Sequence, residues 1–515
     1  MRKDARPMQP PFRRLLIANR GEIALRVIRA CRELGIETVA VYSDADADAL
    51  HVAAADTAER IGPAPAADSY LSVEALVAAA QRSGAEAIHP GYGFLSESAA
   101  FARVVEAAGM VFVGPPAETL AALGDKLAAR RSAAAAGVPI VPGLTIPLDD
   151  DSAAGDLAEV GFPALLKAAA GGGGRGMRRV EDSDEVATAL AAARREAAAA
   201  FGDATIYVER LLAPARHVEV QLLGDRHGAL AVLGERECSV QRRHQKLVEE
   251  SPSPALAADG REALAESARL VAATVPFHNA ATVEFLLDAE GRHYFLEMNT
   301  RLQVEHGVTE LVTGLDLVAW QIRVAAGERL PAEVLKVQPR GHAIEVRLYA
   351  EDPHDGFRPV AGSIDAWRMP DGPGVRVDAG VAAGSLLPVE YDPLLAKVLV
   401  HADSRPAALA RLRRALDETL IGGVQTDLSF LRWLVDEPSF VAGDYDTDLV
   451  PARWGDGPPV TAEEEGLAAL LAREARLAST AAKPAAAPAA ASVAAHERPW
   501  AQAARREGLR RAPRR

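Results

Sequence analysis

In the first hundred or so residues, short apolar runs typical of strands alternate with segments whose apolar residues recur at helical spacing. Short apolar runs predict buried strands at 15–18, 39–42, 87–89 and 111–113. Between the first two runs, residues 23–34 place apolar side chains at helical spacing and stop at Gly35, as in a helix with a C-terminal glycine. Strands that alternate with helices predict an open parallel sheet, whose ligands bind at the carboxyl ends of the strands.

After Gly124 the pattern changes to that of an α+β segment. Helices are predicted at 126–137 and 183–201, a strand at 164–167, and paired strands at 217–223 with 229–234 and at 281–287 with 292–298. A third segment, about 340–450, has short strand-like runs and one clear helix at 405–419. Residues 479–495 are almost entirely alanine with two prolines, which indicates a spacer and not a core.

A glycine run at 171–176 follows the strand at 164–167. Glycine lets backbone N–H groups close around phosphate oxygens, and the nearby Lys167 and Arg175 favour that reading over a merely flexible loop. No Gly-x4-Gly-Lys-Ser/Thr motif occurs, and the turn after the first strand is not Gly-x-Gly-x-x-Gly. A P-loop is therefore excluded, and a dinucleotide-binding fold is poorly supported.

The hairpin predicted at 281–298 carries candidate metal ligands. If residues 288–291 form a two-residue turn, Glu284 lies opposite Phe295 and diagonal to Glu297, with Asn299 one step further on the same face. Oxygen ligands of this kind suit Mg²⁺ bound together with substrate phosphates. A solvated strand face remains the alternative, and a one-residue register shift would separate the two carboxylates.

Two further polar clusters indicate anion chemistry. Arg301, Gln303 and Glu305 share one side if the chain stays extended, although a surface salt bridge would look the same. The segment 236–246 combines arginines, glutamines, a histidine and a lysine beside apolar strands. It suggests binding of polyphosphate and of anions the size of bicarbonate, with a solvated loop as the alternative.

Composition and charge exclude several other classes of protein. The 515 residues carry a formal net charge of −14, which argues against a general nucleic-acid binder despite basic residues near both ends. Two cysteines exclude a disulfide scaffold and a four-cysteine zinc site. There is no apolar run long enough for a membrane span and no apolar stretch after the charged first 14 residues, so we expect no secretory signal and a cytoplasmic location.

Several longer motifs together resemble those of biotin carboxylase, an ATP-grasp enzyme. They are Asn19–Ala24, His89–Glu97, Lys167 with the glycine run, 236–246, Glu297–His306 and Gly341–Arg347. The resemblance runs in order from about residue 12 to about residue 450. It implies an open parallel-sheet domain at 12–124, an ATP-grasp domain at 125–335 with a mobile glycine-rich lid at about 140–212, a β-rich C-terminal domain at 340–450, and a spacer with a basic tail at 451–515.

The resemblance also implies a reaction, in which ATP and bicarbonate form carboxyphosphate and carbon dioxide passes to N1′ of biotin. By resemblance, ATP is bound by Lys126, Lys167, Gly173, Gly174, Glu209, Arg210, Leu211, Leu212, His217, Gln241, His244 and Leu286. The implied ligands of Mg²⁺ or Mn²⁺, at two sites, are Glu284, Glu297 and Asn299. Bicarbonate and biotin are assigned to Lys246, Arg301, Gln303, Val304 and Arg347, with Glu305 as the base that deprotonates bicarbonate and Arg301 stabilising the biotin enolate.

The same resemblance sets the expected partners. These are a biotin carboxyl carrier protein, a carboxyltransferase subunit and a second copy of the chain; no Met-Lys-Met acceptor occurs, so biotin is expected as a substrate on a carrier and not bound covalently here. Gly307 stands where the family usually has proline, which predicts a looser backbone beside Glu305. A non-catalytic scaffold in a carboxylase assembly, or an ATP-grasp ligase with another acceptor, remains the alternative.

Overall fold

The structure is a computed structural model that describes residues 10–144, 147–148, 153–169, 177–455 and 457. The structural features below belong to these residues. The predictions for the glycine run, for Gly173, Gly174 and Arg175, and for the alanine-rich spacer and basic tail lie outside the described residues.

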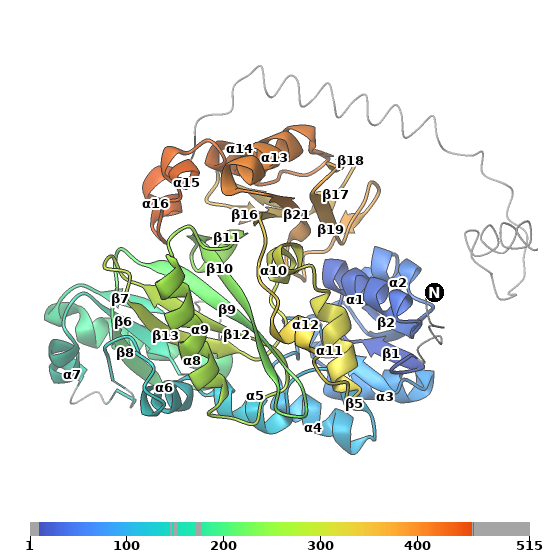
Figure 1. The fold of residues 1–515 in the computed structure, drawn as a ribbon, viewed down its shortest axis with the longest axis horizontal. Helices are drawn as coiled ribbons and strands as arrows, with labels where there is room; N and C mark the ends of the chain where they lie inside the picture. Colours follow the sequence, from blue (N-terminus) through green and yellow to red (C-terminus); the bar gives the residue numbers. More distant parts are fainter. Residues whose placement is uncertain (1–9, 145–146, 149–152, 170–176, 456, 458–515) are drawn as a thin grey trace, which may run out of the picture. The chain divides into compact units, whose positions relative to one another are not determined.

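The N-terminal segment forms a five-stranded parallel sheet in the order β3-β2-β1-β4-β5 (Figure 1, blue). Its strands are β1 (Arg14–Ile17), β2 (Glu37–Ser43), β3 (Thr57–Gly62), β4 (Ala87–His89) and β5 (Val111–Phe112). Helix α1 (Gly21–Glu33) follows β1, and Gly35 after it has φ +73°. The predicted parallel sheet is confirmed, with β3 in addition, an edge strand whose exposed and half-buried, partly charged residues do not form an apolar run.

The second sheet has eight antiparallel strands in the order β13-β12-β9-β10-β11-β14-β21-β19. They are β9 (Arg216–Gly224), β10 (Leu230–Arg242), β11 (Gln245–Ser251), β12 (Asn279–Leu287), β13 (His293–Asn299), β14 (His342–Tyr349), β19 (Val375–Ala379) and β21 (Leu394–Ala402). Both predicted hairpins are present. The pairing of β11 with β14 joins the second predicted segment to the third in one continuous sheet, which the sequence pattern did not predict.

A smaller three-stranded sheet, β7-β6-β8, precedes the large one in the chain. It consists of β6 (Ala164–Ala168), β7 (Arg178–Val180) and β8 (Ile206–Arg210), with α7 (Ala153–Val160) and the alanine-rich α8 (Val186–Phe201) packed on it. Small alanines at buried positions of α8 let the helix approach the sheet closely, which explains why so alanine-rich a segment forms part of a core.

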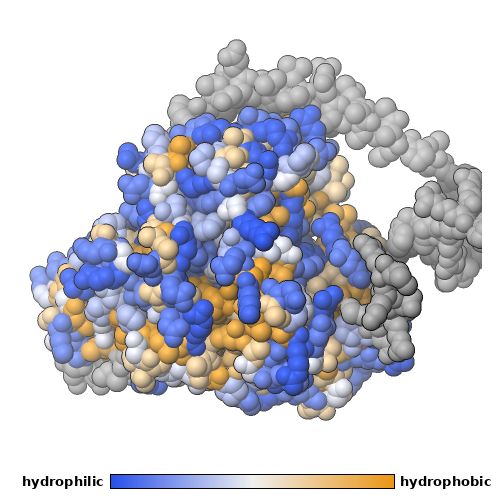
Figure 2. Space-filling view, viewed as in Figure 1, coloured by the Kyte–Doolittle hydropathy of each residue, from blue (hydrophilic) through white to orange (hydrophobic). Residues whose placement is uncertain are grey.

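Several helices pack around the large sheet (Figure 1), and five of them matter for the site and the core described below. They are α6 (Lys126–Ala135), α9 (Ala258–Ala272), α10 (His306–Thr313), α11 (Leu317–Ala325) and α13 (Arg405–Glu418). On the face in Figure 2, hydrophilic side chains dominate around α13, and hydrophobic ones gather in the lower centre of the view. Of the described helices, none is long and apolar enough to cross a membrane.

Candidate active site

A cavity of about 1550 Å³ draws its walls from all three segments of the chain. Of the residues that the sequence assigned to a site, nineteen line it: Lys126, Lys167, Glu209, Arg210, Leu211, Leu212, His217, Gln241, His244, Lys246, Glu284, Leu286, Glu297, Asn299, Arg301, Gln303, Val304, Glu305 and Arg347. The other two, Gly173 and Gly174, lie outside the described residues. Side chains separated by more than 200 residues in the chain therefore face one space.

The metal-ligand hairpin forms with a different register from the predicted one. Glu284 pairs directly with Glu297, and a bulge follows, so that Phe285 pairs with Phe295. The prediction that Glu284 lies opposite Phe295 is wrong because the turn is not a two-residue turn: it spans 288–292, where the side chain of Asp288 accepts from the N–H groups of Glu290 and Arg292. The bulge shifts the register by one further residue and so keeps Glu284 and Glu297 on the same face of the hairpin. As a directly opposite pair, the two carboxylates lie closer together than the predicted diagonal pair would.

Glu284, Glu297 and Asn299 form a compact donor set. Asn299 Nδ2 donates to Glu284 Oε1 at 2.9 Å and to Glu297 Oε1 at 3.4 Å. Burial alone would raise the pKa of Glu284, but Lys246 and His217 outweigh it and hold that pKa well below its usual value. Two ionised carboxylates directly opposite each other, one buried (Glu284) and one half-buried (Glu297), need positive charge between or beside them, so the residues fit a divalent cation.

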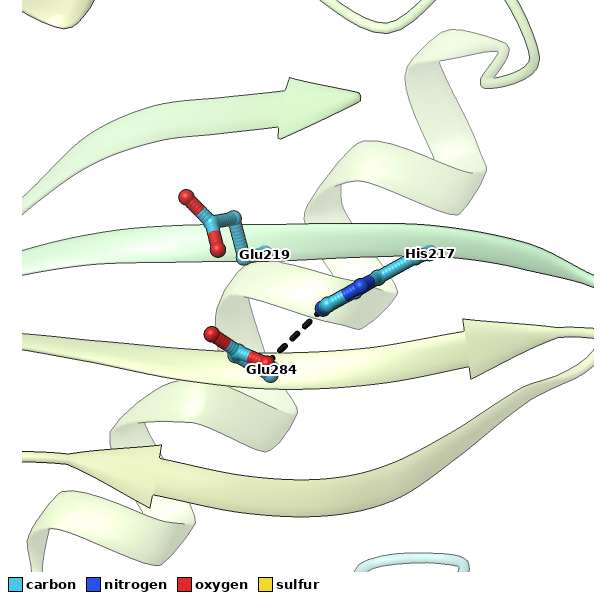
Figure 3. A group of neighbouring side chains, drawn as sticks. All are labelled: His217, Glu219 and Glu284. Atoms are coloured by element: carbon cyan, nitrogen blue, oxygen red, sulfur yellow. Dashed lines mark ion pairs between the residues drawn. The ribbon is translucent and has the colours of Figure 1, made fainter. Parts of the chain in front are cut away.

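Lys246 is the cationic centre of the cavity. Its Nζ donates to Glu219 Oε2 at 2.6 Å, to Glu305 Oε1 at 2.8 Å and to Glu284 Oε1 at 3.0 Å. Figure 3 shows His217 and Glu219 on β9 beside Glu284 on β12, with His217 Nε2 2.8 Å from Glu284 Oε2. One ammonium thus bridges three carboxylates, two of which also contact an arginine: Glu219 contacts Arg236, and Glu305 contacts Arg347.

Glu305 ends the loop after β13 and is the N-cap residue of α10. Its two oxygens have different partners: Oε1 accepts from Lys246, and Oε2 accepts from Arg347 Nη2 at 2.9 Å. Burial raises the pKa of Glu305, but Lys246, Arg347 and Arg236 outweigh it, so that the pKa lies well below its usual range. The group is therefore a carboxylate.

Residues 300–305 form a loop and not an extended strand, so the predicted alternation does not hold. Arg301 and Gln303 still meet, because Arg301 Nη1 donates to Gln303 Oε1 at 2.7 Å. Gln303 Nε2 in turn donates to Glu284 Oε1 at 3.0 Å, and Arg301 Nε lies 3.2 Å from Glu97 Oε2. The guanidinium and the metal carboxylates belong to one hydrogen-bonded network.

The other end of the cavity carries two lysines. Lys126, which follows the helix cap Asp125, donates to Glu297 Oε2 at 2.8 Å. Lys167 on β6 donates to Glu209 Oε2 at 2.9 Å, and Arg130 is the second partner of Glu209. Each lysine side chain is thus held by a carboxylate, with Lys167 buried and Lys126 half-buried.

The basic cluster at 236–246 divides into two parts. Arg236 is fully buried and donates to Glu219, Gln221 and the hydroxyls of Thr282 and Thr309, so its role is structural and the prediction of an anion site does not extend to it. Gln241, Arg242, Arg243, His244, Gln245 and Lys246 line the cavity. They surround the tight turn between β10 and β11, in which Arg243 and His244 have positive φ.

Sequence reasoning missed Glu219. His217, Glu219 and Gln221 alternate with apolar residues on β9 and are all buried, so they face the same side of a covered strand. A polar alternation inside a buried strand is the signal that could have found it. Cys238 also lies close to Glu219 and Glu305, and burial raises the pKa of its thiol well above the usual value, so it remains a thiol.

Together these features define an ATP-grasp ligase: a parallel-sheet domain, an antiparallel sheet, and a cavity that combines paired carboxylates with phosphate-type cations. Family comparisons agree. Residues 11–120 match "Biotin carboxylase, N-terminal domain", residues 125–333 match "Carbamoyl-phosphate synthase L chain, ATP binding domain", and residues 345–452 match "Biotin carboxylase C-terminal domain".

Whole-chain comparisons give the particular family. The chain is 48% identical over 440 residues to a biotin carboxylase of Halalkalibacterium halodurans, covering 85% of this chain and 97% of that protein. It is 49% identical over 441 residues to biotin carboxylase 1 of Bacillus subtilis, covering 85% and 98%. The chain therefore belongs to the biotin carboxylase family of ATP-grasp ligases.

Longer relatives and solved structures extend the likeness. A mitochondrial methylcrotonoyl-CoA carboxylase subunit alpha of Glycine max is 49% identical over 439 residues, and the chain spans 60% of its length. The biotin carboxylase domain dimer of Hydrogenobacter thermophilus 2-oxoglutarate carboxylase, solved with MgADP, ADP and bicarbonate, is 43% identical with a TM-score of 0.85 and covers 87% of this chain and 99% of that one. The predicted fold class and enzyme class are confirmed.

Proposed function

We propose that this chain activates bicarbonate with ATP as carboxyphosphate and carboxylates biotin that is carried by a separate protein. The observation that carries the proposal is the convergence of Lys246, Glu305 and Arg347 with the Glu284–Glu297 pair in one cavity. This set supplies cations for an anion, a carboxylate base and ligands for a divalent metal, which are the three requirements of the reaction.

Glu305 is the proposed base for bicarbonate. Bicarbonate is a poor nucleophile until it loses its proton, so a carboxylate within hydrogen-bond reach is needed. Bicarbonate bound by Lys246, Arg301 and the backbone at Val304 would take Lys246 away from Glu305. Losing a neutralising cation raises the pKa of the carboxylate, so Glu305 becomes a stronger base at the moment its substrate binds.

Phosphoryl transfer is the proposed task of the metal and the two lysines. Glu284, Glu297 and Asn299 would hold Mg²⁺ or Mn²⁺ at two sites, and the metal would supply charge neutralisation on the phosphates. Lys126 and Lys167 would leave their carboxylate partners and bind phosphate oxygens. Residues 209–212 with Leu286 would enclose the adenine, and His217, Gln241 and His244 would contact ribose or phosphate.

The proposed partners follow from the direction of the reaction. Biotin arrives on a biotin carboxyl carrier protein and leaves carboxylated for a carboxyltransferase subunit, with Arg347 and Gln303 holding the ureido ring. Arg301 would stabilise the biotin enolate. We propose a homodimer, by analogy with the dimer of the 2-oxoglutarate carboxylase domain, and a cytoplasmic location.

The test is biotin-dependent release of ADP with free biotin, ATP, Mg²⁺ and bicarbonate. We expect Glu305→Gln to lower kcat about 10²–10⁴-fold, the usual contribution of a positioned base. Glu237→Gln is the matched control, because Glu237 is equally buried but hydrogen-bonded to Ser239 and Ser253 and does not line the cavity. A Glu305→Gln variant as active as Glu237→Gln would contradict the assigned role.

The same assay decides between the alternatives. ATP binding without turnover, even when biotinylated carrier is supplied, would indicate a non-catalytic scaffold. ADP release that depends on another acceptor and not on biotin would indicate a different ATP-grasp ligase.

A further inference from the structure

One face of the large sheet carries a buried layer of charge in which only Arg347 has a role in the proposed reaction. Glu345 and Arg347 alternate on β14. Glu345 pairs directly with Glu249 of β11, and Arg347 pairs directly with Lys397 of β21. Directly paired residues share a sheet face, so these four side chains lie together beneath α10, and three of them have no exposed surface.

Three carboxylate oxygens in this layer lack hydrogen-bond partners among the described residues. They are both oxygens of Glu345 and Oε2 of Glu249. Glu249 Oε1 accepts from Arg347 Nε at 2.7 Å, while Arg347 Nη2 reaches Glu305 Oε2 at 2.9 Å. Two buried carboxyl groups on adjacent strands with so few donors cannot both be ionised at low cost, since like charges at this spacing raise each other's pKa.

The charges of Lys397 and Arg347 partly offset the effect of burial on the pKa of Glu345, but among the described residues neither side chain donates a hydrogen bond to it. The Lys397 ammonium donates to Val304 O at 2.6 Å and lies 3.2 Å from Glu22. From α10, His306 is neutral, because burial lowers its pKa well below the usual value, and Glu310 is paired with Arg26 and Arg376.

Two further structural neighbours of Glu345 also form no hydrogen bond with its carboxylate among the described residues. The opposite face of β14 packs against apolar residues of α13. At Gly307, a Cβ atom would lie 3.1 Å from Glu345 Oε2, so α10 approaches this carboxylate closely, and no hydrogen bond to it is formed by the described residues. Burial raises the pKa of Glu345 well above its usual value and that of Glu249 to about 7.

We propose that Glu345 and Glu249 share one proton in the resting enzyme, and that this proton keeps Arg347 bridged to Glu305. The inference rests on the proposed function, in which Glu305 is the base and Arg347 binds biotin. If the pair lost its proton, a second full negative charge would stand behind Arg347. The guanidinium would then be drawn toward the pair and away from both Glu305 and biotin, so Glu345 acts as a positioning residue and not as a catalytic one.

The test is the pH dependence of kcat/KM for biotin, from about pH 6 to about pH 9. Activity requires the protonated pair, so it should fall on the alkaline side as the pair loses its proton. Glu345→Gln mimics the protonated acid and cannot ionise. We expect it to move the alkaline fall upward by about one pH unit or more, and Glu345→Asp, which keeps an ionisable carboxyl group, to retain the fall.

Glu237→Gln again serves as the control, because burial raises the pKa of Glu237 to about 7 as it does that of Glu249, yet Glu237 has no contact with Arg347. Its profile should coincide with the wild type. A Glu345→Gln profile that also coincides with the wild type would overturn the proposal.

A second measurement does not depend on turnover. Infrared difference spectra of the resting wild-type protein minus Glu345→Gln should show the carbonyl stretch of a protonated carboxylic acid, and its absence at neutral pH would overturn the proposal. A protein that shows this band but no biotin-dependent turnover would refute the proposed function and leave the shared proton established.

Discussion

Gly307 offers a quantitative test of how tightly α10 is packed on the sheet. A Cβ atom at residue 307 would lie 2.3 Å from Leu399 Cδ2, and Leu399 is fully buried on β21. The φ of Gly307 is not positive, so a Gly307→Ala variant suffers no backbone strain. Alanine gains up to about 1 kcal/mol of helix propensity, whereas overpacking of a buried core costs about 1–3 kcal/mol. We therefore expect Gly307→Ala to be neutral or to destabilise by up to about 2 kcal/mol.

A double-mutant cycle separates the two terms. Leu399→Ala alone should cost about 2–5 kcal/mol, but in that background the new methyl group at 307 fills part of the cavity, so the coupling should favour the double variant by about 0.5–3 kcal/mol. The assay is the shift in thermal midpoint relative to the wild type, since a chain with several domains has no single two-state free energy of unfolding.

Gly155→Ala is the matched control, because Gly155 lies inside α7 with no atom within 4 Å of a Cβ. It should be neutral or stabilising. Close packing of α10 against Leu399 would be contradicted if Gly307→Ala raised the midpoint as much as Gly155→Ala does, or if Leu399→Ala left the effect of the added methyl group unchanged.

Three more predictions follow from the charges of the site and the core. Glu297→Gln removes a metal ligand and the partner of Lys126, so the Mg²⁺ concentration for half-maximal ADP release should rise at least about tenfold; an unchanged requirement would exclude Glu297 as a ligand. Lys167→Met should raise the KM for ATP more than that for biotin, measured by steady-state kinetics, and equal effects on both would contradict its place at the phosphates. Burial lowers the pKa of His51 to about 4 and that of His89 to about 3, so the unfolded chain binds protons that the native state excludes. The contribution of these two histidines to stability should fall as pH drops below about 6.5, by up to about 2.7 kcal/mol per pH unit for the two together. Buried carboxyl groups with a raised pKa, such as Glu237 and Glu249, act in the opposite direction, so the measurement is the thermal midpoint of the wild type relative to His51→Gln, and a difference that stays constant between about pH 6.5 and 4.5 would refute this.

Much of the fold follows from local pattern. The apolar runs at 15–18 and 39–42, separated by an amphipathic helix, specify a parallel unit because each strand must be buried on both faces. The apolar pattern did not predict β3, because an edge strand needs no such apolar run. The motif-bearing segments likewise identify the candidate site residues, since their residue types and order are present in the chain before it folds.

The sequence pattern could not predict the strand register or which charged side chains contact one another. The alignment of Glu284 with Glu297 depends on a five-residue turn and a bulge, whose energies differ too little for a pattern to rank them. The roles within the 236–246 segment were also hidden, because only tertiary packing buries Arg236 among Glu219, Gln221 and two threonines while leaving Lys246 in the cavity.

The sequence by itself determined the classes of element, the candidate ligands and the family resemblance, because hydrophobic period and motif order are local properties. Only the tertiary structure decided which charges meet. The pairing of β11 with β14 joins two segments almost 100 residues apart and sets Glu249 against Glu345 and Arg347 beside Glu305. Electrostatic energies depend on distance and burial, and neither exists until the chain has folded.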